Sequence, residues 1–199
     1  KMVSSLFNSI LLKGVRSGQI PARTQQSRDW FREQAKRATG ATGEKVIKEA
    51  DKAQYKTQIT IGKMYLFSYD AKHKKTLPYF DRFPLIFPIS RVKGMMTGLN
   101  FHYLPLKQRA ILMDALYEIA NNDRFDETTK LKVSYDVLSG ASRFKWFAPT
   151  IHNYLRSQLR SRFIEIPPTD WDTAIFLPLS KFEGASSRTV WADSRKKMS

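Results

Sequence analysis

Apolar residues near the start of the chain recur with the period of an α-helix. Val3, Leu6, Phe7, Ile10 and Leu11 fall at i, i+3, i+4, i+7 and i+8, which places them on one face of an amphipathic helix. The segment is too short to cross a bilayer. We expect this face to bind a partner; docking on the chain's own domain and docking on a membrane surface are the alternatives.

A second helix is expected after Pro21, with Ser27 as its N-cap and its end near Ala38. A glycine-containing break follows, and the segment that precedes Tyr55 has the composition of a short polar helix. Residues 1–56 are therefore expected to form a helical N-terminal arm.

The pattern changes between residues 55 and 104, where β-branched and aromatic residues fill short segments separated by glycine and proline. This composition predicts one or two strands over 55–70 with a bend at Gly62, a strand over 84–90 and another over 98–104. Pro78, Pro84 and Pro88 are expected at strand starts and edges, where a missing N–H costs least. Short strands of this kind predict a small bent antiparallel sheet or a partial barrel.

Helical spacing returns after Pro105 and predicts helices over residues 106–120, 126–139 and 148–163. In the last of these, Ile151 and Leu155 would face inward and Arg156 and Arg160 outward. A strand over 162–166, a short helix over 169–176 and a basic tail over 186–199 complete the chain. The predicted fold class is α+β, with a core domain over residues 57–185.

Composition indicates a folded chain without thiol chemistry. A length of 199 residues with 42% hydrophobic and 13% aromatic content can bury a substantial core. The chain has no cysteine, which excludes disulfides, thiolate metal sites and thiol nucleophiles. Its three histidines are isolated in the sequence, and neither a phosphate-binding glycine loop nor a nucleophile elbow occurs. We therefore expect no metal, no cofactor, no small-molecule substrate and no catalysis.

Charge is the strongest functional signal, because a net charge of +16 is distributed in blocks. Residues 1–38 carry eight bases and two acids, residues 71–109 carry eight and one, and residues 110–142 carry three and six. Such segregation indicates a polyanionic partner, most often nucleic acid. A phage or ribosomal protein lodged among acidic subunits would show the same pattern.

Two segments supply the candidate DNA contacts. Residues 143–163 hold five bases, several aromatic residues and no acid; cations bind phosphates and aromatic rings stack on bases. The alternative is that the rings lie in the core and the arginines on a solvated face. The second segment is the KHKK run at 72–75, for which a solvated turn is the alternative. The predicted DNA-binding residues are Lys72, Lys74, Lys75, Arg143, Lys145, Trp146, Arg156, Arg160 and Arg162.

Several stretches of the chain resemble a family of virion proteins from T-even-like contractile-tailed phages, particularly those of marine hosts. The stretches that carry the resemblance span residues 62–89, 98–105, 123–139, 157–163, 171–182 and 190–197. Members of that family are commonly labelled DNA end protector proteins. The resemblance implies a non-catalytic virion protein at the portal vertex that binds the ends of packaged double-stranded DNA and blocks exonucleases.

The same resemblance implies assembly in the host cytoplasm, with other phage structural proteins as partners. A different function fits the motifs equally well. The chain would then be a structural component of the phage neck, tail or baseplate, whose basic arms bind acidic protein subunits.

Overall fold

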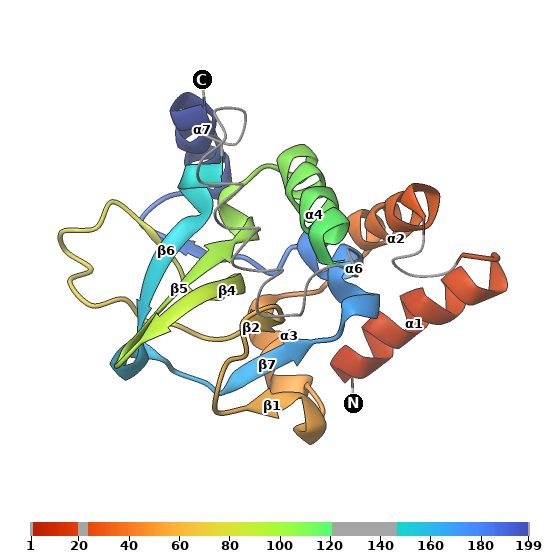
Figure 1. The fold of residues 1–199 in the computed structure, drawn as a ribbon, viewed down its shortest axis with the longest axis horizontal. Coiled ribbons are helices and arrows are strands. Elements are labelled where there is room, and N and C mark those ends of the chain that lie inside the picture. Colours follow the sequence, from red (N-terminus) through yellow and green to blue (C-terminus); the bar gives the residue numbers. More distant parts are fainter. Residues whose placement is uncertain (1, 20–23, 121–146, 199) are drawn as a thin grey trace.

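A computed structural model describes residues 2–19, 24–120 and 147–198 of the chain (Figure 1). Its α-helices are α1 (Met2–Arg16), α2 (Gln25–Arg37), α3 (Gly43–Glu49), α4 (Leu106–Ala120), α6 (Trp171–Phe176) and α7 (Ser187–Met198). Its strands are β1 (Tyr55–Lys56), β2 (Met64–Leu66), β3 (Phe80–Asp81), β4 (Leu85–Val92), β5 (Met95–Asn100), β6 (Ile151–Leu155), β7 (Phe163–Ile166) and β8 (Phe182–Glu183). Short 3-10 turns are η1 (Lys52–Gln54), η2 (Phe101–Tyr103), η4 (Arg156–Gln158) and η5 (Pro168–Asp170). The α+β class is confirmed.

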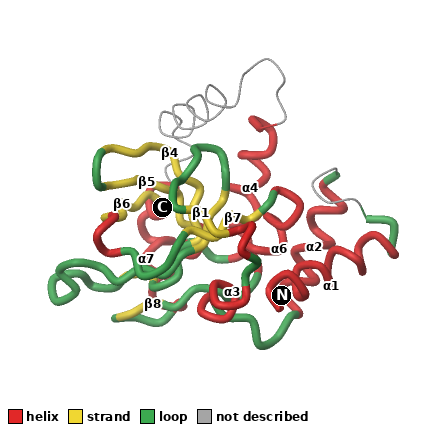
Figure 2. The backbone as a smooth tube through the Cα atoms, turned by 90° about the horizontal axis from the view of Figure 1, so that it is seen from below, coloured by secondary structure: helices red, strands yellow, loops and turns green. Residues whose placement is uncertain are grey.

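Six strands form one open antiparallel sheet in the order β1-β7-β2-β4-β5-β6, and β3 pairs with β8 in a separate small sheet. The small bent sheet is thus confirmed, and it does not close into a barrel. Figures 1 and 2 place α1 and α2 on one side of the molecule and the β4–β5 hairpin on the other. This separation leaves the hairpin side of the sheet for other contacts.

Both faces of the central strands are buried, because alternate side chains along a strand point in opposite directions. Met64 and Leu66 face the cluster that contains residues from α1, α2, α4 and α6. Tyr65, with Phe67 just beyond β2, faces a second cluster rich in aromatic rings. The second cluster lies beneath the hairpin side and includes Tyr154, whose ring meets Phe67 edge-on at 5.5 Å.

The β4–β5 hairpin closes through a two-residue turn, because Val92 pairs with Met95. Gly94 occupies the left-handed region with φ of 79°, a conformation that glycine adopts without a steric penalty. Pro84 precedes β4 as predicted, whereas Pro88 lies inside the strand. Strand β2 ends its pairing at Ile86, so Pro88 has no β2 neighbour that needs its missing N–H, and the register with β5 shifts just after it.

The predicted helix over residues 148–163 is wrong. Residues 151–155 form β6, which pairs with β5 from Leu99↔Ile151 to Met95↔Leu155, and residues 156–158 form η4. The apolar spacing of Ile151, Tyr154 and Leu155 fits a helix locally, but pairing of five residues with β5 gives hydrogen-bond partners to backbone groups along an otherwise open sheet edge. The strand over 162–166 and the helix over 169–176 are confirmed within a few residues as β7, η5 and α6.

The N-terminal half of the fold is correctly predicted in outline but not at its caps. Helix α2 begins at Gln25, where Thr24 accepts a hydrogen bond from the Ser27 N–H, so Thr24 is the N-cap and Ser27 lies within the first turn. Gly62 has φ of 100° at the predicted bend.

Helix α4 spans the predicted residues 106–120, and the predicted helix over 126–139 lies outside the described residues.

The apolar face of α1 lies against the chain's own core. Phe7 and Ile10 are buried, and Leu6 and Leu11 are partly buried; the side chain of Val3 lies outside what the structure describes. Docking on its own domain is therefore the role that the structure supports for Phe7 and Ile10. Partner binding by this face, like the division into arm, core and tail, stays a prediction.

Truncating Phe7 tests whether α1 belongs to the core. Phe7→Ala is expected to lower the free energy of unfolding by about 2 kcal/mol, less than for a central Phe because a terminal helix can detach from the rest. The melting temperature should fall by about 4–8 °C. Leu12→Ala is the matched control on the same helix, since Leu12 is 54% exposed. An equal response of both variants would show that α1 does not dock as described.

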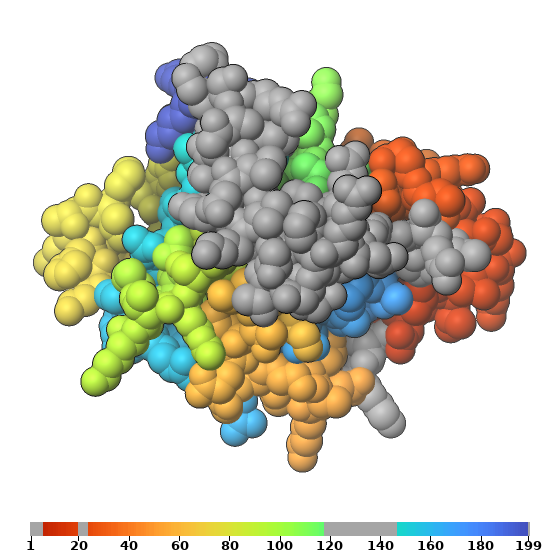
Figure 3. Space-filling view, viewed as in Figure 1, coloured from red at the N-terminus to blue at the C-terminus, as the bar shows by residue number. Residues whose placement is uncertain are grey.

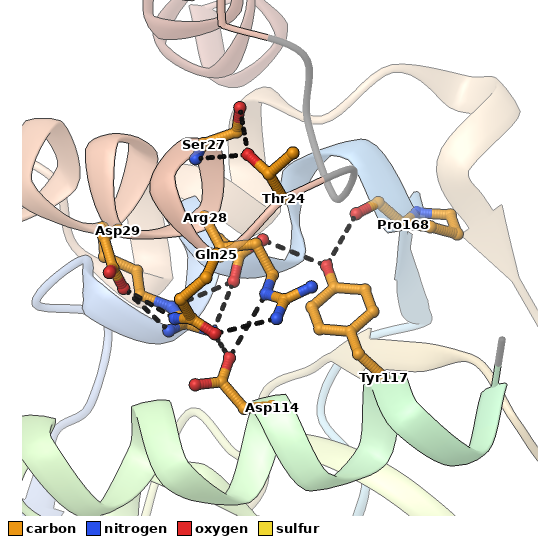
Figure 4. Close-up of polar contacts among 10 residues, drawn as sticks. Thr24, Gln25, Ser27, Arg28, Asp29, Asp114, Tyr117 and Pro168 are labelled. Atoms are coloured by element: carbon orange, nitrogen blue, oxygen red, sulfur yellow. Dashed lines mark hydrogen bonds and ion pairs between the residues drawn. The ribbon is translucent and has the colours of Figure 1, made fainter.

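Helices α2, α4 and α6 are joined by a buried ion network (Figure 4). Arg32 on α2 forms ion pairs with Asp172 on α6 at 2.8 Å and with Asp114 on α4 at 2.7 Å. Arg28 also reaches Asp114 at 3.3 Å and lies over the Tyr117 ring at 4.9 Å. The Tyr117 hydroxyl lies 3.1 Å from Asp172 Oδ2 and 3.4 Å from the Pro168 carbonyl oxygen. Each charge in the network thus has a partner on another helix.

The C-terminal residues 187–198 form α7, which packs on η2. Ser194 donates to the Tyr103 carbonyl oxygen at 2.7 Å, and Trp191 donates to the His102 carbonyl oxygen at 2.9 Å. Arg109 lies over the Trp191 ring at 5.4 Å. The basic residues at the end of the chain are therefore held on a helix beside β6, as Figure 1 shows.

Candidate nucleic-acid interface

The fold brings together two basic segments that are far apart in the sequence. The loop over 71–79 follows Tyr69, and Tyr69 forms a β-bridge with Leu159. The Asp70 N–H donates to the Gln158 carbonyl oxygen at 3.0 Å, and the Arg160 N–H donates to the Ser68 carbonyl oxygen at 2.8 Å. These backbone bonds place the KHKK loop next to the arginines that follow β6.

Cations from the two segments meet around one carboxylate. Asp70 lies 2.9 Å from Lys74 Nζ and 3.7 Å from Arg160 Nη2. The hydrogen bond from Lys74, together with the charges of Lys74 and Arg160, lowers the pKa of Asp70. Lys74 and Arg160 are each 48% exposed, so both present their remaining N–H groups to the solvent.

A second group of cations surrounds the tip of the β4–β5 hairpin. Arg91, Lys93 and Arg156 line a hollow of about 370 Å³ together with Gly94 and Gln58. Arg156 is anchored there by two contacts. Its backbone N–H donates to the Gly94 carbonyl oxygen at 2.9 Å, and its guanidinium Nη2 donates to the Thr57 carbonyl oxygen at 2.7 Å. Anchored guanidinium groups lose less side-chain freedom when they bind a phosphate.

These two groups form one region, which we call the basic surface. Figure 3 shows it along one side of the molecule, where the loop over 71–79, the hairpin tip and the segment after β6 adjoin one another, opposite α1. Its members are exposed side chains on three segments of the chain: Lys72, Lys74, Lys75, Arg91, Lys93, Arg156, Arg160 and Arg162. Such a surface can bind phosphates electrostatically without reading base sequence.

The loop of the basic surface has an unusual backbone. His73 has φ of 61°, in the left-handed region that residues other than glycine seldom adopt. A compact turn fixes it, because the Thr76 N–H and hydroxyl both donate to the His73 carbonyl oxygen, at 3.0 and 2.9 Å. Strained backbone of this kind is concentrated at functional sites.

The predicted DNA-binding residues divide into two groups. Lys72, Lys74, Lys75, Arg156, Arg160 and Arg162 are exposed on the basic surface. Arg143, Lys145 and Trp146 lie outside the described residues. Their role in DNA binding stays a prediction.

The described aromatic residues among these cations do not form a stacking platform. Phe147, Tyr154 and Phe163 are all buried. Tyr154 packs edge-on against Tyr69 at 5.0 Å, and Phe163 against Phe67 at 5.3 Å. The alternative that these rings belong to the core is therefore confirmed, and their function is to support the strands that carry the arginines.

Sequence reasoning missed two groups on this side of the molecule. Arg91 precedes the hairpin turn and Lys93 lies in it, and the basic RVKG run at 91–94 is the available signal. The second group is a buried pair in which His102 Nδ1 donates to Asp81 Oδ2 at 2.7 Å. No sequence motif marks that pair, because its two residues are 21 positions apart.

The Asp81–His102 pair is enclosed in the core. Neither side chain is exposed. Burial lowers the pKa of His102 despite Asp81. Burial also acts to raise the pKa of Asp81, but the bonds from His102 and Asn100 outweigh it and leave that pKa lowered. The Asp81 carboxylate accepts from four donors, namely the His102 ring, the Asn100 amide and the N–H groups of Phe83 and Lys181, whereas His102 Nε2 is buried without a hydrogen-bond partner among the described residues.

The described part of the chain shows no cluster of three His, Asp or Glu side chains arranged to hold a metal ion. Within the same residues, no helix has the length and apolar character needed to cross a bilayer. The arrangement supports binding of an extended anion.

Comparison with protein families gives a match over almost the entire chain. The family described as phage T4 terminal DNA protecting protein matches residues 1–195. No curated protein and no solved structure matches the chain. The family match confirms the resemblance seen in the sequence and agrees with a surface suited to phosphates. The chain therefore belongs to the phage T4 terminal DNA protecting protein family, whose members are phage proteins that protect the ends of DNA.

Proposed function

We propose that the protein protects DNA ends by occupying them through the basic surface, without catalysis. The observation that carries this proposal is the convergence of the loop over 71–79 with the segment after β6, which puts Lys74 and Arg160 on either side of Asp70. Cations spread along such a surface can follow the phosphates of both strands near a terminus. A nuclease that must enter at the terminus is then excluded sterically.

We further propose that the protein acts at the portal vertex of the virion, where a terminus of packaged linear DNA lies, and that it joins the particle during assembly in the host cytoplasm. Contacts with other phage structural proteins are part of this proposal. The exposed apolar side chains Leu12 and Val15 on α1, at 54% and 61% exposure, lie beside Lys13 and Arg16 and offer a surface for such contacts.

Exonuclease protection of linear duplex DNA tests this function directly. With about six phosphates contacted, the slope of log affinity against log salt is expected to be about −5, so binding should fall by on the order of 10³-fold between about 50 and 200 mM salt. Protection against a 3′→5′ and a 5′→3′ exonuclease should decline over the same range.

Two results would contradict the proposal. Saturating protein that leaves both exonucleases unimpeded at low salt would show that binding does not block the ends. Shortening of the DNA by the protein itself in the presence of Mg²⁺ would show that the protein is catalytic. If the duplex stays unprotected while the protein binds acidic tail or baseplate subunits, the structural alternative takes its place.

A further inference from the structure

A second cavity adjoins the basic surface between the loop over 71–79, β6 and α7. It has a volume of about 410 Å³, within the range of sites that hold small ligands. Lys72 and Tyr79 line it from the loop, His152 and Asn153 from β6, and Lys197 from α7. Its lining also includes buried side chains of the aromatic cluster, such as Phe80 and Tyr154, which close it on the inner side.

One wall of this pocket is a pre-formed pair of stacked rings. Tyr103 and His152 lie 3.9 Å apart between ring centroids, with an interplanar angle of 23°. The pair is fixed, because His152 Nε2 donates to the Pro149 carbonyl oxygen at 2.8 Å and the Tyr103 carbonyl oxygen accepts from Ser194 on α7. Burial lowers the pKa of His152, which favours the neutral ring.

Two lysines line the pocket, one from the loop over 71–79 and one from α7. Lys72 is exposed on the loop and Lys197 is exposed on α7. The lysines can therefore bind a phosphate at the mouth of the pocket, and the ring pair offers a flat apolar surface at its wall. A nucleotide combines these two properties, since it has a phosphate and a planar base attached to one sugar.

We propose that this pocket holds the terminal nucleotide of a DNA strand, with its base against the Tyr103–His152 pair and its phosphate between Lys72 and Lys197. This inference rests on the proposed function, because it adds to the basic surface a site that distinguishes an end from the rest of the duplex. Rings that are already fixed lose little freedom on binding a base.

Selection of ends follows from the closed inner side of the pocket. A strand cannot pass through it, so an internal nucleotide would have to flip out of the duplex with both neighbours attached, at a cost of a few kcal/mol. A terminal nucleotide has one stacking neighbour and one covalent connection, so it enters more easily. The basic surface supplies general affinity and the pocket supplies the preference.

The test compares an open linear duplex with a dumbbell of the same sequence whose two ends are closed by hairpin loops. Wild-type protein is expected to bind the open duplex about tenfold more tightly, within the range that one stacked base contributes. Leu77→Trp fills the pocket without changing charge, because Leu77 lines it and is 42% exposed. This variant should bind both probes with the dumbbell affinity.

Leu12→Trp on α1 is the matched control, and it should keep the tenfold preference. A 5-iodo-2′-deoxyuridine at the terminal position should photo-crosslink to a peptide that contains Tyr103 or His152, whereas the same base near the middle of the duplex should not. His152→Ala should retain folding and lose the crosslink to the peptide that contains position 152.

The outcomes separate this inference from the proposed function. Equal wild-type affinity for the two probes, or a preference unchanged in Leu77→Trp, overturns the pocket and leaves DNA binding by the basic surface in place. A wild-type protein that binds neither probe at low salt overturns both. Binding of an acidic peptide at this pocket with no crosslink to terminal bases would assign the pocket to a protein partner and overturn the inference.

Discussion

Reversing Arg156 and Arg160 to glutamate is expected to abolish DNA binding near physiological salt. Arg156 lies at the hairpin group of cations and Arg160 at the loop group, so the double variant weakens both halves of the basic surface. Each phosphate contact gives about 1 kcal/mol at 4 Å in water, and reversal replaces attraction with repulsion. The dissociation constant should therefore rise by roughly 100-fold or more, and the salt slope should flatten by about two.

Folding should survive these substitutions. Arg156 and Arg160 are exposed. Their side chains donate to the carbonyl oxygens of Thr57, Ser157 and Leu159 and to the Gln58 side chain, and the ion pair of Arg160 with Asp70 at 3.7 Å is itself largely solvated. Circular dichroism and the melting temperature verify that the variant is folded, and fluorescence anisotropy at several salt concentrations gives the slope.

Two further variants make the result specific. The double variant Lys13→Glu, Arg16→Glu changes the net charge by the same amount as the double reversal of Arg156 and Arg160. It does so on α1, at the opposite side of the molecule (Figure 1). If that variant loses binding as strongly, affinity depends on total charge and the basic surface has no special role. Arg156→Lys with Arg160→Lys keeps both charges and should keep the slope.

The sequence predicts those parts of the fold whose determinants are local. The region after Pro105 shows helical spacing over 106–120, and the helix is there. The segment around β6 shows the limit. Its apolar residues at 151, 154 and 155 suit a helix, but five of its residues pair with the open edge of β5. Pairing between segments 52 or more positions apart overrides local propensity, and a single sequence does not reveal it.

The sequence predicts most of the residues that belong to the candidate site but not that they lie together in the fold. Positive charge without acids marked both the KHKK run and the arginines after Tyr154. Their proximity depends on the Tyr69↔Leu159 bridge, which joins positions with no shared motif. The core role of the aromatic residues was one of the two alternatives for this segment, and the strand realises it by turning Tyr154 into the core while Asn153 faces out. The pocket wall of Tyr103 and His152 arises in the same non-local way.

Removing Arg32 is expected to cause a large loss of stability on the helical side. Its side chain is 3% exposed and holds the carboxylates of Asp172 and Asp114. Arg32→Ala leaves Asp172 buried without a cation, so the free energy of unfolding should fall by about 3–5 kcal/mol. The melting temperature should fall by roughly 6–20 °C. Arg32→Met with Asp172→Leu removes both charges and should recover much of the loss, because apolar residues of similar volume fill the site.

The pH dependence of stability provides an independent check that the uncompensated charge of Asp172 causes the loss. Burial raises the pKa of Asp172 to about 6 even beside Arg32, and loss of the guanidinium should raise it further. A carboxyl whose folded pKa exceeds its unfolded value takes up a proton on folding, so its contribution improves as pH falls through the folded pKa and is lost as pH rises through it. The deficit of Arg32→Ala relative to wild type should therefore narrow between about pH 7 and pH 5 in chemical denaturation.

Asp29 provides the matched control, because it also pairs with Arg32, at 3.4 Å, but is 60% exposed. Asp29→Ala should change the free energy of unfolding by less than about 0.5 kcal/mol at either pH, as exposed ion pairs do. A deficit of Arg32→Ala that is the same at both pH values would show that lost packing of the arginine stem, and not the uncompensated charge of Asp172, limits stability. A loss at Asp29 as large as that at Arg32 would show that burial does not set the strength of the network, since the two contacts share one guanidinium and differ chiefly in exposure.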